Sequence, residues 1–260
     1  AYAPESVRVY WDTSLSAENS AKKSLEFLIR VLDDTRPFSL ELVTFSAGEE
    51  QKLRKQLRPQ PDELAFEVDA LTYNSGTDLE TLFETEQGIQ PADVCFLVTD
   101  GRSTVRNAPT ERLPCQLHVI SAADDADTAL LGYLARQGGG HYLNLANTSV
   151  TTARNQLDRA LPDVQTFQID GQPRIDDLEW RTEAGGIRLF APVAIDARNL
   201  TLEIDGNRIS APLNPARAAR ADSLGANWAA LKLTSERVRG ASRDDLVALS
   251  RKYSVVAEET

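Results

Sequence analysis

The sequence lacks any apolar run that approaches the roughly 20 residues needed to span a bilayer, so we expect no transmembrane segment. Basic residues are scarce: 28 Lys and Arg stand against 39 Asp and Glu, and the net charge of −11 argues against nucleic acid as the main partner. The opening residues, AYAPESVRV, have neither the basic nor the apolar region of a targeting peptide. We expect such a peptide to be absent or already removed.

Cysteine is also rare, with only Cys95 and Cys115 among 260 residues. Each lies near the start of a predicted strand, and their spacing does not indicate a zinc or redox site. The favoured interpretation is two buried free thiols, and the alternative is a disulfide between neighbouring strands. Neither state decides between a secreted and a cytosolic protein.

The composition is that of an ordinary soluble protein, with 42% hydrophobic and 26% charged residues. A length of 260 residues favours one large domain with a smaller appendage. Residues 1–163 carry 15 basic and 25 acidic residues, a net charge of −10, whereas the remainder carries 13 and 14, a net charge of −1. The acidic part would repel an acidic ligand unless a bound cation reversed the local sign.

Short apolar runs alternate with amphipathic segments through the first 163 residues. Strands are predicted at 6–12, 38–46, 63–71, 94–100, 116–121 and 141–145, with 63–71 at an edge. Helices are predicted at 17–33, 48–57, 78–86, 125–137 and 149–161. This alternation predicts an α/β fold with a doubly wound, mostly parallel sheet covered by helices on both faces. The GGG at 138–140 precedes a strand, so we interpret it as a helix cap and turn rather than a phosphate loop.

The pattern changes after Pro162. Short alternating segments between 164 and 213 predict a small antiparallel β unit, in which EIDGNRI carries the Asp-Gly pair of a tight hairpin. Residues 214–260 return to helix, and Ser242 with Asp245 forms a capping-box pattern. We therefore predict three parts: 1–163, 164–213 and 214–260.

The stretch DTSLS places Asp12, Ser14 and Ser16 at alternate positions where the first strand ends. Thr77 lies in the loop before a predicted helix, and Asp100 ends the most apolar strand. In a parallel sheet the carboxyl ends of strands meet at one edge, where ligands bind. Two carboxylates and three hydroxyls are hard oxygen donors that suit Mg2+, so these residues predict a metal site.

This pattern, D-x-S-x-S, then Thr before a helix, then Asp after a later strand, resembles the metal-ion-dependent adhesion site of von Willebrand factor type A domains. The resemblance covers roughly residues 5–163. It implies that Ser14, Ser16 and Thr77 are direct ligands of Mg2+, or of Mn2+ or Ca2+, and that Asp12 and Asp100 bind directly or through water. It also implies a site that captures an Asp or Glu side chain of a protein partner.

Many members of that family have Gly between the two serines and Met after the second, whereas this chain has Leu15 and Ala17. The change removes no metal oxygen, but it places a bulky side chain at the rim. We expect Leu15, Asn74 and Arg102 to form the rim that meets a partner.

The tail from Ala226 is similar to the segment that follows the A domain in proteins that pair it with a vault/inter-alpha-trypsin domain. The similarity depends on Trp228, the run RDDLVALSRKYSVV and the closing EET. It implies that the chain is a fragment or a variant of such a protein.

These residues also have ordinary structural interpretations. Ser, Thr and Asp are common helix caps, and each site residue alone would be an ordinary turn residue. His118 and His141 lie in strands without a nucleophile elbow, which argues against a serine hydrolase. Ser14 stands where a phosphatase with an aspartate nucleophile would need a second acid. The tryptophans Trp11, Trp180 and Trp228 are expected in the core.

The sequence therefore predicts a noncatalytic, Mg2+-dependent protein-binding or adhesion module, on a bacterial surface or in another extracytoplasmic setting. Two alternatives remain: an intracellular assembly factor that presents its metal to an ATPase, and a structural A domain without a ligand role.

Overall fold

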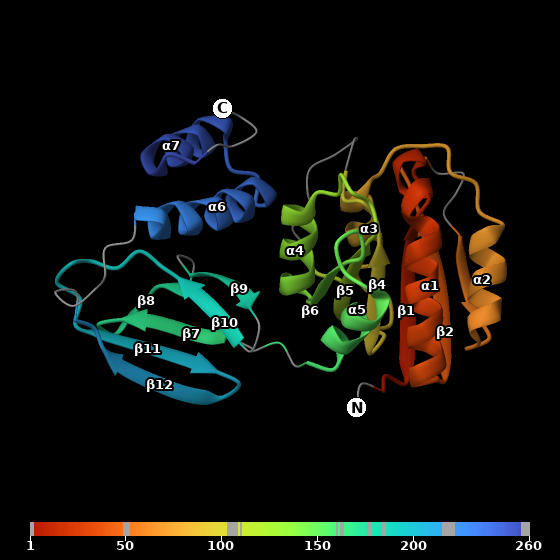
Figure 1. Cartoon of the computed structure of the whole chain (residues 1–260), viewed down its shortest axis with the longest axis horizontal. Coiled ribbons are helices and arrows are strands. Elements are labelled where there is room, and N and C mark those ends of the chain that lie inside the picture. Colours follow the sequence, from red (N-terminus) through yellow and green to blue (C-terminus); the bar gives the residue numbers. More distant parts are fainter. Residues whose placement is uncertain are drawn as a thin grey trace. The chain divides into compact units, whose positions relative to one another are not determined.

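Residues Ala1–Leu161 (unit 1) and Pro162–Thr260 (unit 2) form separate units in the computed structural model of the chain (Figure 1). The structure describes residues 3–48, 53–102, 109, 111–159, 161, 164–175, 178–183, 186–214 and 222–255. Unit 1 alternates strands with helices, and unit 2 has antiparallel strands followed by two helices.

Unit 1 is built on a six-stranded sheet of order β3-β2-β1-β4-β5-β6. All neighbouring pairs are parallel except β2 and β3, which confirms the predicted mostly parallel, doubly wound α/β fold. The strands are β1 (Ser6–Asp12), β2 (Ser39–Phe45), β3 (Arg54–Leu57), β4 (Val94–Val98), β5 (Gln116–Ser121) and β6 (Gly139–Asn144).

Five helices and one 3-10 turn accompany these strands in the part of unit 1 that the structure describes. They are the turn at Leu15–Ala17, α1 (Glu18–Thr35), α2 (Pro61–Asp69), α3 (Leu79–Thr85), α4 (Thr128–Gln137) and α5 (Val150–Leu157). The side chains of Asp78, Asp127 and Ser149 cap α3, α4 and α5 by accepting backbone N–H groups, as short helices require. No helix in the described part of the chain has the length and apolar character to cross a membrane.

One face of β1 is apolar. Val7, Val9 and Trp11 are buried in a core with Phe96 of β4. Side chains of α1, α2 and α5 fill the same core, so these three helices cover one face of the sheet. The alternation of strand side chains sends Arg8, Tyr10 and Asp12 to the opposite face.

The predictions for residues 48–71 were wrong in type. The segment predicted as a helix at 48–57 ends in β3, which pairs antiparallel with β2 at the edge of the sheet; residues 49–52 lie outside the described residues. Its Lys, Arg and Gln are good helix formers, but pairing with β2 and burial of Leu57 override that preference.

The predicted edge strand at 63–71 is instead occupied by α2. Its Leu64 and Val68, four residues apart, are buried in the core. Pro61 at the first turn, followed by Asp62 and Glu63, is the start signal of a helix that the alternating pattern concealed.

The interpretation of GGG as a cap and turn is correct only in part. Gly138 caps α4, while Gly139 and Gly140 belong to β6, and the left-handed residue is Gly139 (φ 69°). A Cβ atom on Gly140 would lie 2.1 Å from the carbonyl oxygen of Leu117, so glycine there permits the close approach of β6 to β5.

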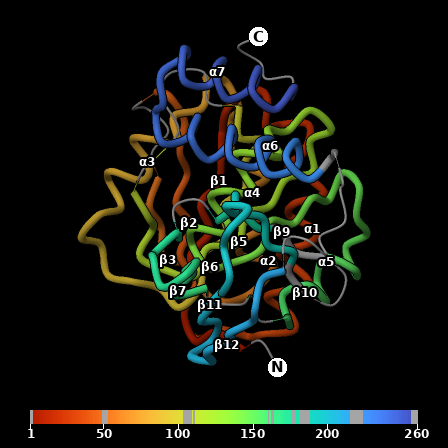
Figure 2. The backbone as a smooth tube through the Cα atoms, turned by 90° about the vertical axis from the view of Figure 1, so that its left-hand side faces the viewer, coloured from red at the N-terminus to blue at the C-terminus, as the bar shows by residue number. Residues whose placement is uncertain are grey.

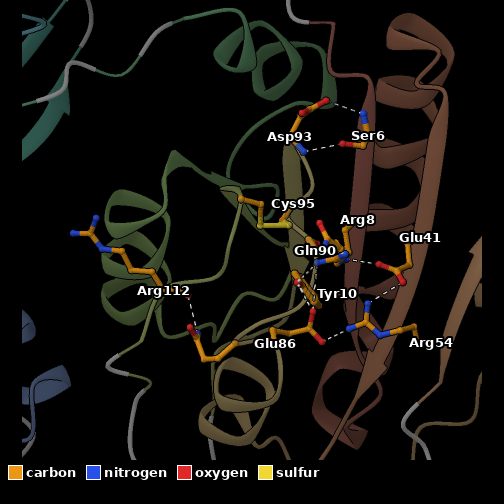
Figure 3. The surroundings of a disulfide bond; sticks show 12 residues. Ser6, Arg8, Tyr10, Glu41, Arg54, Glu86, Gln90, Asp93, Cys95 and Arg112 are labelled. Atoms are coloured by element: carbon orange, nitrogen blue, oxygen red, sulfur yellow. Dashed lines mark hydrogen bonds and ion pairs between the residues drawn. A yellow bond between two sulfur atoms is a disulfide. The ribbon is translucent and has the colours of Figure 1, made fainter.

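The structure joins Cys95 and Cys115 by a disulfide, so the favoured prediction of two free thiols was wrong. Cys95 lies in β4, and Cys115 immediately precedes the neighbouring β5, with a Cα–Cα distance of 5.8 Å. The parallel register of the two strands brings these positions within bonding reach. Figure 3 shows that the bond lies beside Arg8, on the polar face of β1.

Unit 2 contains a four-stranded antiparallel sheet of order β12-β11-β7-β8 and a two-stranded sheet, β10-β9. The strands are β7 (Val164–Ile169), β8 (Gln172–Pro173), β9 (Glu179–Glu183), β10 (Gly186–Phe190), β11 (Asn199–Ile204) and β12 (Asn207–Pro212). Asp205 and Gly206, both with positive φ, form the predicted hairpin between β11 and β12. Phe167 and Leu202 belong to the small core of this unit.

Two helices complete unit 2, α6 (Asp222–Val238) and α7 (Arg243–Tyr253), and they run side by side (Figure 2). Trp228 and Tyr253 meet edge to face, with ring centroids 5.2 Å apart. Ser242 caps α7 by accepting the N–H of Asp245 and donating its hydroxyl to that carboxylate, as predicted. The closing EET lies outside the described residues.

Candidate functional site

The candidate site forms where the chain leaves two neighbouring strands of the central sheet. β1 is followed by a connection towards β2 on one side, while β4 lies on its other side, so the strand order reverses between them. The register pairs Trp11 with Val98, which places Asp12 and Thr99 at the same level of the sheet. This is the place in a doubly wound sheet where ligands bind.

Asp12 is the centre of the site. Its Oδ1 accepts the backbone N–H of Ser14 at 2.8 Å, and its Oδ2 accepts the hydroxyls of Thr99 at 2.6 Å and Thr77 at 3.2 Å. The pKa of Asp12 is raised to about 6, mainly by burial. The hydrogen bonds from Thr99 and Ser14 oppose this rise, and the charge of Asp100 adds to it. The ionised form is therefore less favoured than in an exposed aspartate, and a nearby positive charge would stabilise it.

The serine loop is fixed by contacts to the loop that carries Thr77. Ser14 has an extended backbone and pairs with Ser75, and the N–H of Leu15 donates to the carbonyl of Ser75 at 2.9 Å. The hydroxyls of Ser14 and Ser16 lie 3.3 Å apart. Ser14 is buried and Ser16 is exposed, so the pair extends from the interior to the surface.

Thr77 is fully buried beside Asp12. The next residue, Asp78, begins α3 by accepting the N–H of Thr81 at 3.0 Å and its hydroxyl at 2.8 Å. The capping role expected for an aspartate near a helix start thus belongs to Asp78, and the hydroxyl of Thr77 points to the carboxylate of Asp12.

Asp100 supplies the second carboxylate and is fully buried. Its Oδ1 accepts the N–H of Arg102 at 2.9 Å, whereas its Oδ2 has no hydrogen-bond partner among the residues that the structure describes. A buried carboxylate oxygen without a partner is costly, because it has lost its water and gained nothing in exchange. A bound cation would satisfy this oxygen, so the donor set fits Mg2+.

All five predicted ligands are thus gathered at one edge of the sheet. Hydrogen bonds connect Asp12, Ser14, Ser16 and Thr77, and the charge of Asp100 acts on Asp12. The described residues contain no group of three or more His, Cys, Asp or Glu side chains placed to hold a metal, so any cation here would depend on the hydroxyls.

Sequence reasoning missed Thr99. Its hydroxyl donates to Asp12 and accepts the N–H of Gly101 at 3.0 Å, which fixes the loop that carries Asp100. The signal was present, because a threonine directly before Asp100 interrupts the apolar run VCFLV at the carboxyl end of β4.

The three predicted rim residues lie at the surface. The Leu15 side chain is 62% exposed although it stands between two candidate ligands, and Asn74 is exposed on the neighbouring loop. Arg102 is exposed and forms an ion pair with Asp125, with 2.6 Å between Nη1 and Oδ2. The rim thus combines an apolar side chain with polar and charged groups.

The histidines lie away from this edge. His118 is buried within β5, stacks between Phe96 and His141, and accepts the N–H of His141 at Nδ1 (3.0 Å). Burial and, to a smaller extent, the charge of His141 together lower the pKa of His118 to about 3. Both histidines thus lie in strands of the sheet and not at the candidate site. Trp11 is buried, and Trp180 and Trp228 are half-buried.

No family model and no curated protein matches the chain. Among solved structures, it is similar to proximal thread matrix protein 1 from the mussel byssus, with a TM-score of 0.43 and 14% identity over 63% of this chain and 49% of that chain. It is similar to the vWF domain of the type V pili tip protein Mfa5 from Porphyromonas gingivalis, with a TM-score of 0.30 and 18% identity over 42% and 43% of the two chains.

A third similar structure is the human COPII-coat protein Sec24c, with a TM-score of 0.40 and 12% identity over 96% of this chain and 50% of that chain. The chain spans half or less of the length of these three structures. Similarity at this level does not identify a family.

Proposed function

We propose that unit 1 is a noncatalytic, Mg2+-dependent protein-binding module that captures a carboxylate of a partner. Asp12, Ser14, Ser16, Thr77 and Asp100 would hold the ion, which would act as a Lewis acid towards the partner's carboxylate. The observation that carries the proposal is the buried Oδ2 of Asp100, which lacks a hydrogen-bond partner among the described residues in a site that already holds Asp12.

The charges of the site support this choice of ligand. Two carboxylates balance the two charges of Mg2+, and the hydroxyls add none, so the ion would stay attractive to a further carboxylate. Without a cation, residues 1–163 carry a net charge of −10 and would repel an acidic partner. The resemblance of the five residues to the adhesion site of von Willebrand factor type A domains supports the same proposal.

The disulfide supports the extracytoplasmic setting over the intracellular alternative. Cys95 and Cys115 are joined in the structure, and such bonds persist mainly in oxidising compartments. An assembly factor in a reducing cytosol would have little use for this bond.

The positions of the histidines support binding rather than catalysis. His118 lies within β5 with its ring between two other rings, and His141 is bonded at Nε2 to the carbonyl of Arg159 at 2.7 Å. Neither ring lies at the carboxyl edge where Asp12 and Asp100 are. A base acting on a bound substrate would have to stand at that edge.

Calorimetric titration of the full chain with MgCl2 tests the proposal. We expect binding by the wild type, and at least ~10-fold weaker binding by Asp12→Asn, because that change removes one of two ligand charges. Asp33→Asn is the matched control, since Asp33 is an exposed aspartate on α1. Absence of Mg2+ binding by the wild type would overturn the proposal and favour the purely structural alternative.

Partner capture requires a second experiment. Proteins retained by the immobilised chain in MgCl2 should be released by chelator, and Thr77→Ala should retain less of them while staying folded. A partner held equally well in chelator would contradict a metal-bridged carboxylate.

A further inference from the structure

A second group of ionisable side chains lies on the polar face of β1, separate from the candidate metal site. Arg8 comes from β1, Glu41 from β2 and Arg54 from β3, while Glu86 is the residue that ends α3. Arg8 is 6% exposed and Glu86 is 3% exposed, so these charges are well removed from water. We call these four residues the charge cluster.

Ion pairs connect the four members (Figure 3). Arg8 pairs with Glu41, and its Nη1 lies 3.5 Å from Oε2 of Glu86. Arg54 pairs with Glu86, and its Nη1 lies 2.8 Å from Oε1 of Glu41. The hydroxyl of Tyr10 donates to Oε2 of Glu86 at 2.9 Å. The carboxylate that ends α3 is therefore held by three side chains of the sheet.

A cluster of this kind is not explained by stability alone. The desolvation of buried ions largely cancels their attraction, and apolar side chains of similar volume often serve stability equally well. Buried charges do confer directionality, because each carboxylate must meet its guanidinium groups at specific places. The charge cluster is thus suited to fixing where α3 ends.

The other end of α3 reaches the metal site. Thr77, two residues before the helix, donates to Asp12, and Asp78 caps the first turn. The segment of α3 therefore lies along β1 and is attached to the same face of that strand at both ends.

We propose that the charge cluster positions Thr77, by way of α3, for the metal site at the opposite end of the helix. The inference depends on the proposed function for its link to Mg2+, but the positioning itself can be measured without metal. These four are positioning residues, because none of them has a described contact with the site: Arg8 and Arg54 bind Glu86 at the end of α3, and Glu41 binds both arginines.

Amide hydrogen exchange of the metal-free chain tests the positioning. In Glu86→Gln the N–H of Thr81, which is bonded to Asp78, should exchange ~10-fold faster than in wild type, because the end of α3 is released. Leu157→Ala is the control: Leu157 is buried on α5, on the other face of the sheet. Exchange in both variants is compared with exchange in the wild type at urea concentrations that give the three proteins the same global free energy of unfolding. Equal exchange in Glu86→Gln and Leu157→Ala would overturn the proposal.

Titration with MgCl2 tests the link to the site. Glu86→Gln should bind Mg2+ ~10-fold more weakly, whereas Leu157→Ala should stay within about twofold of wild type. Wild-type affinity in Glu86→Gln would overturn the link to the metal site. Failure of the wild type to bind Mg2+ would instead overturn the proposed function, and the exchange experiment would still decide the positioning.

Arg54→Gln provides a second variant if Glu86→Gln does not fold. The Arg54 side chain is 35% exposed, so its loss leaves a smaller buried defect. Arg54→Gln should also speed the exchange of the Thr81 N–H and weaken Mg2+ binding, each to a smaller extent. Wild-type values for both would overturn the proposal.

Discussion

The two faces of β1 divide its seven residues between two different purposes. On one face Val7, Val9 and Trp11 are packed in an apolar core with three helices. On the other, Arg8 and Asp12 are held by ion pairs and hydrogen bonds to loops and to the ends of α3. The difference teaches that a strand buried on both faces need not have one kind of core. Apolar packing stabilises the sheet, whereas directional contacts determine where the site residues stand.

The largest expected effect comes from the apolar face. Phe96→Ala should lower the free energy of unfolding by ~3–5 kcal/mol, because it removes a large, fully buried ring. Urea unfolding measures this loss. If the two faces are independent, the Mg2+ affinity of the folded variant stays at the wild-type value. A strong decrease in affinity would contradict the separation of roles between the two faces.

A smaller effect is expected from the disulfide, which belongs to the polar face. Cys95→Ala combined with Cys115→Ala should lower the free energy of unfolding by about 3 kcal/mol, since the bond closes a loop with a sequence separation of 20. The chain unfolded in the presence of a reductant is the control and should match the double variant. No difference between the oxidised wild type and the variant would contradict the prediction.

His118 is a polar exception on the apolar face, because it lies next to Phe96 in the sheet. Burial lowers its pKa from 6.5 to about 3, so below pH 6.5 the unfolded chain binds a proton that the folded chain refuses. His118 should therefore reduce stability by up to about 1.4 kcal/mol per pH unit as the pH falls from 6.5 towards 3.

Unfolding of wild type and His118→Asn between pH 7 and pH 4 measures this contribution. The asparagine can still accept the N–H of His141 but does not titrate, so the curve of the variant should be flatter. If the free energy of unfolding has the same pH dependence in wild type and variant, the assignment of this dependence to His118 is contradicted.

The smallest effect concerns the site itself. In chelator, Asp12→Asn should leave the free energy of unfolding unchanged or raise it by up to ~1 kcal/mol, because it removes a buried charge from a side chain of the same shape. Saturating MgCl2 should reverse the order, since the wild type, which binds the ion more tightly, gains more stability from it. Thermal unfolding with and without MgCl2 measures both values. A clear loss of stability of the variant in chelator would contradict this prediction.

The sequence was sufficient to predict most of unit 1, because its strands are continuous apolar runs and most of its helices carry clear stripes. It was also sufficient to predict that Asp12, Ser14, Thr77 and Asp100 lie close together, because loops at the carboxyl ends of parallel strands meet at one edge of the sheet. Residues 48–71 were predicted wrongly because β3 exposes Arg54 to Gln56 and depends on pairing with β2, a long-range contact with no local signature.

The charge cluster could not be predicted for a related reason. Arg8 and Glu41 are aligned across β1 and β2 only through the strand register, and Glu86 reaches them only through the course of α3. Single charged residues in separate segments look like solvent-exposed positions until the register is known. The disulfide likewise required the alignment of β4 with β5.

The two attachments of the α3 segment to β1 have a consequence for how this segment can vary. Many substitutions on the outer side of α3 would leave both attachments in place, but an inserted or deleted residue would not. Each residue turns a helix by ~100°, so a single deletion would swing Thr77 away from Asp12 while Glu86 stayed with Arg8. Natural variants of this chain should therefore differ in the composition of α3 far more readily than in its number of residues.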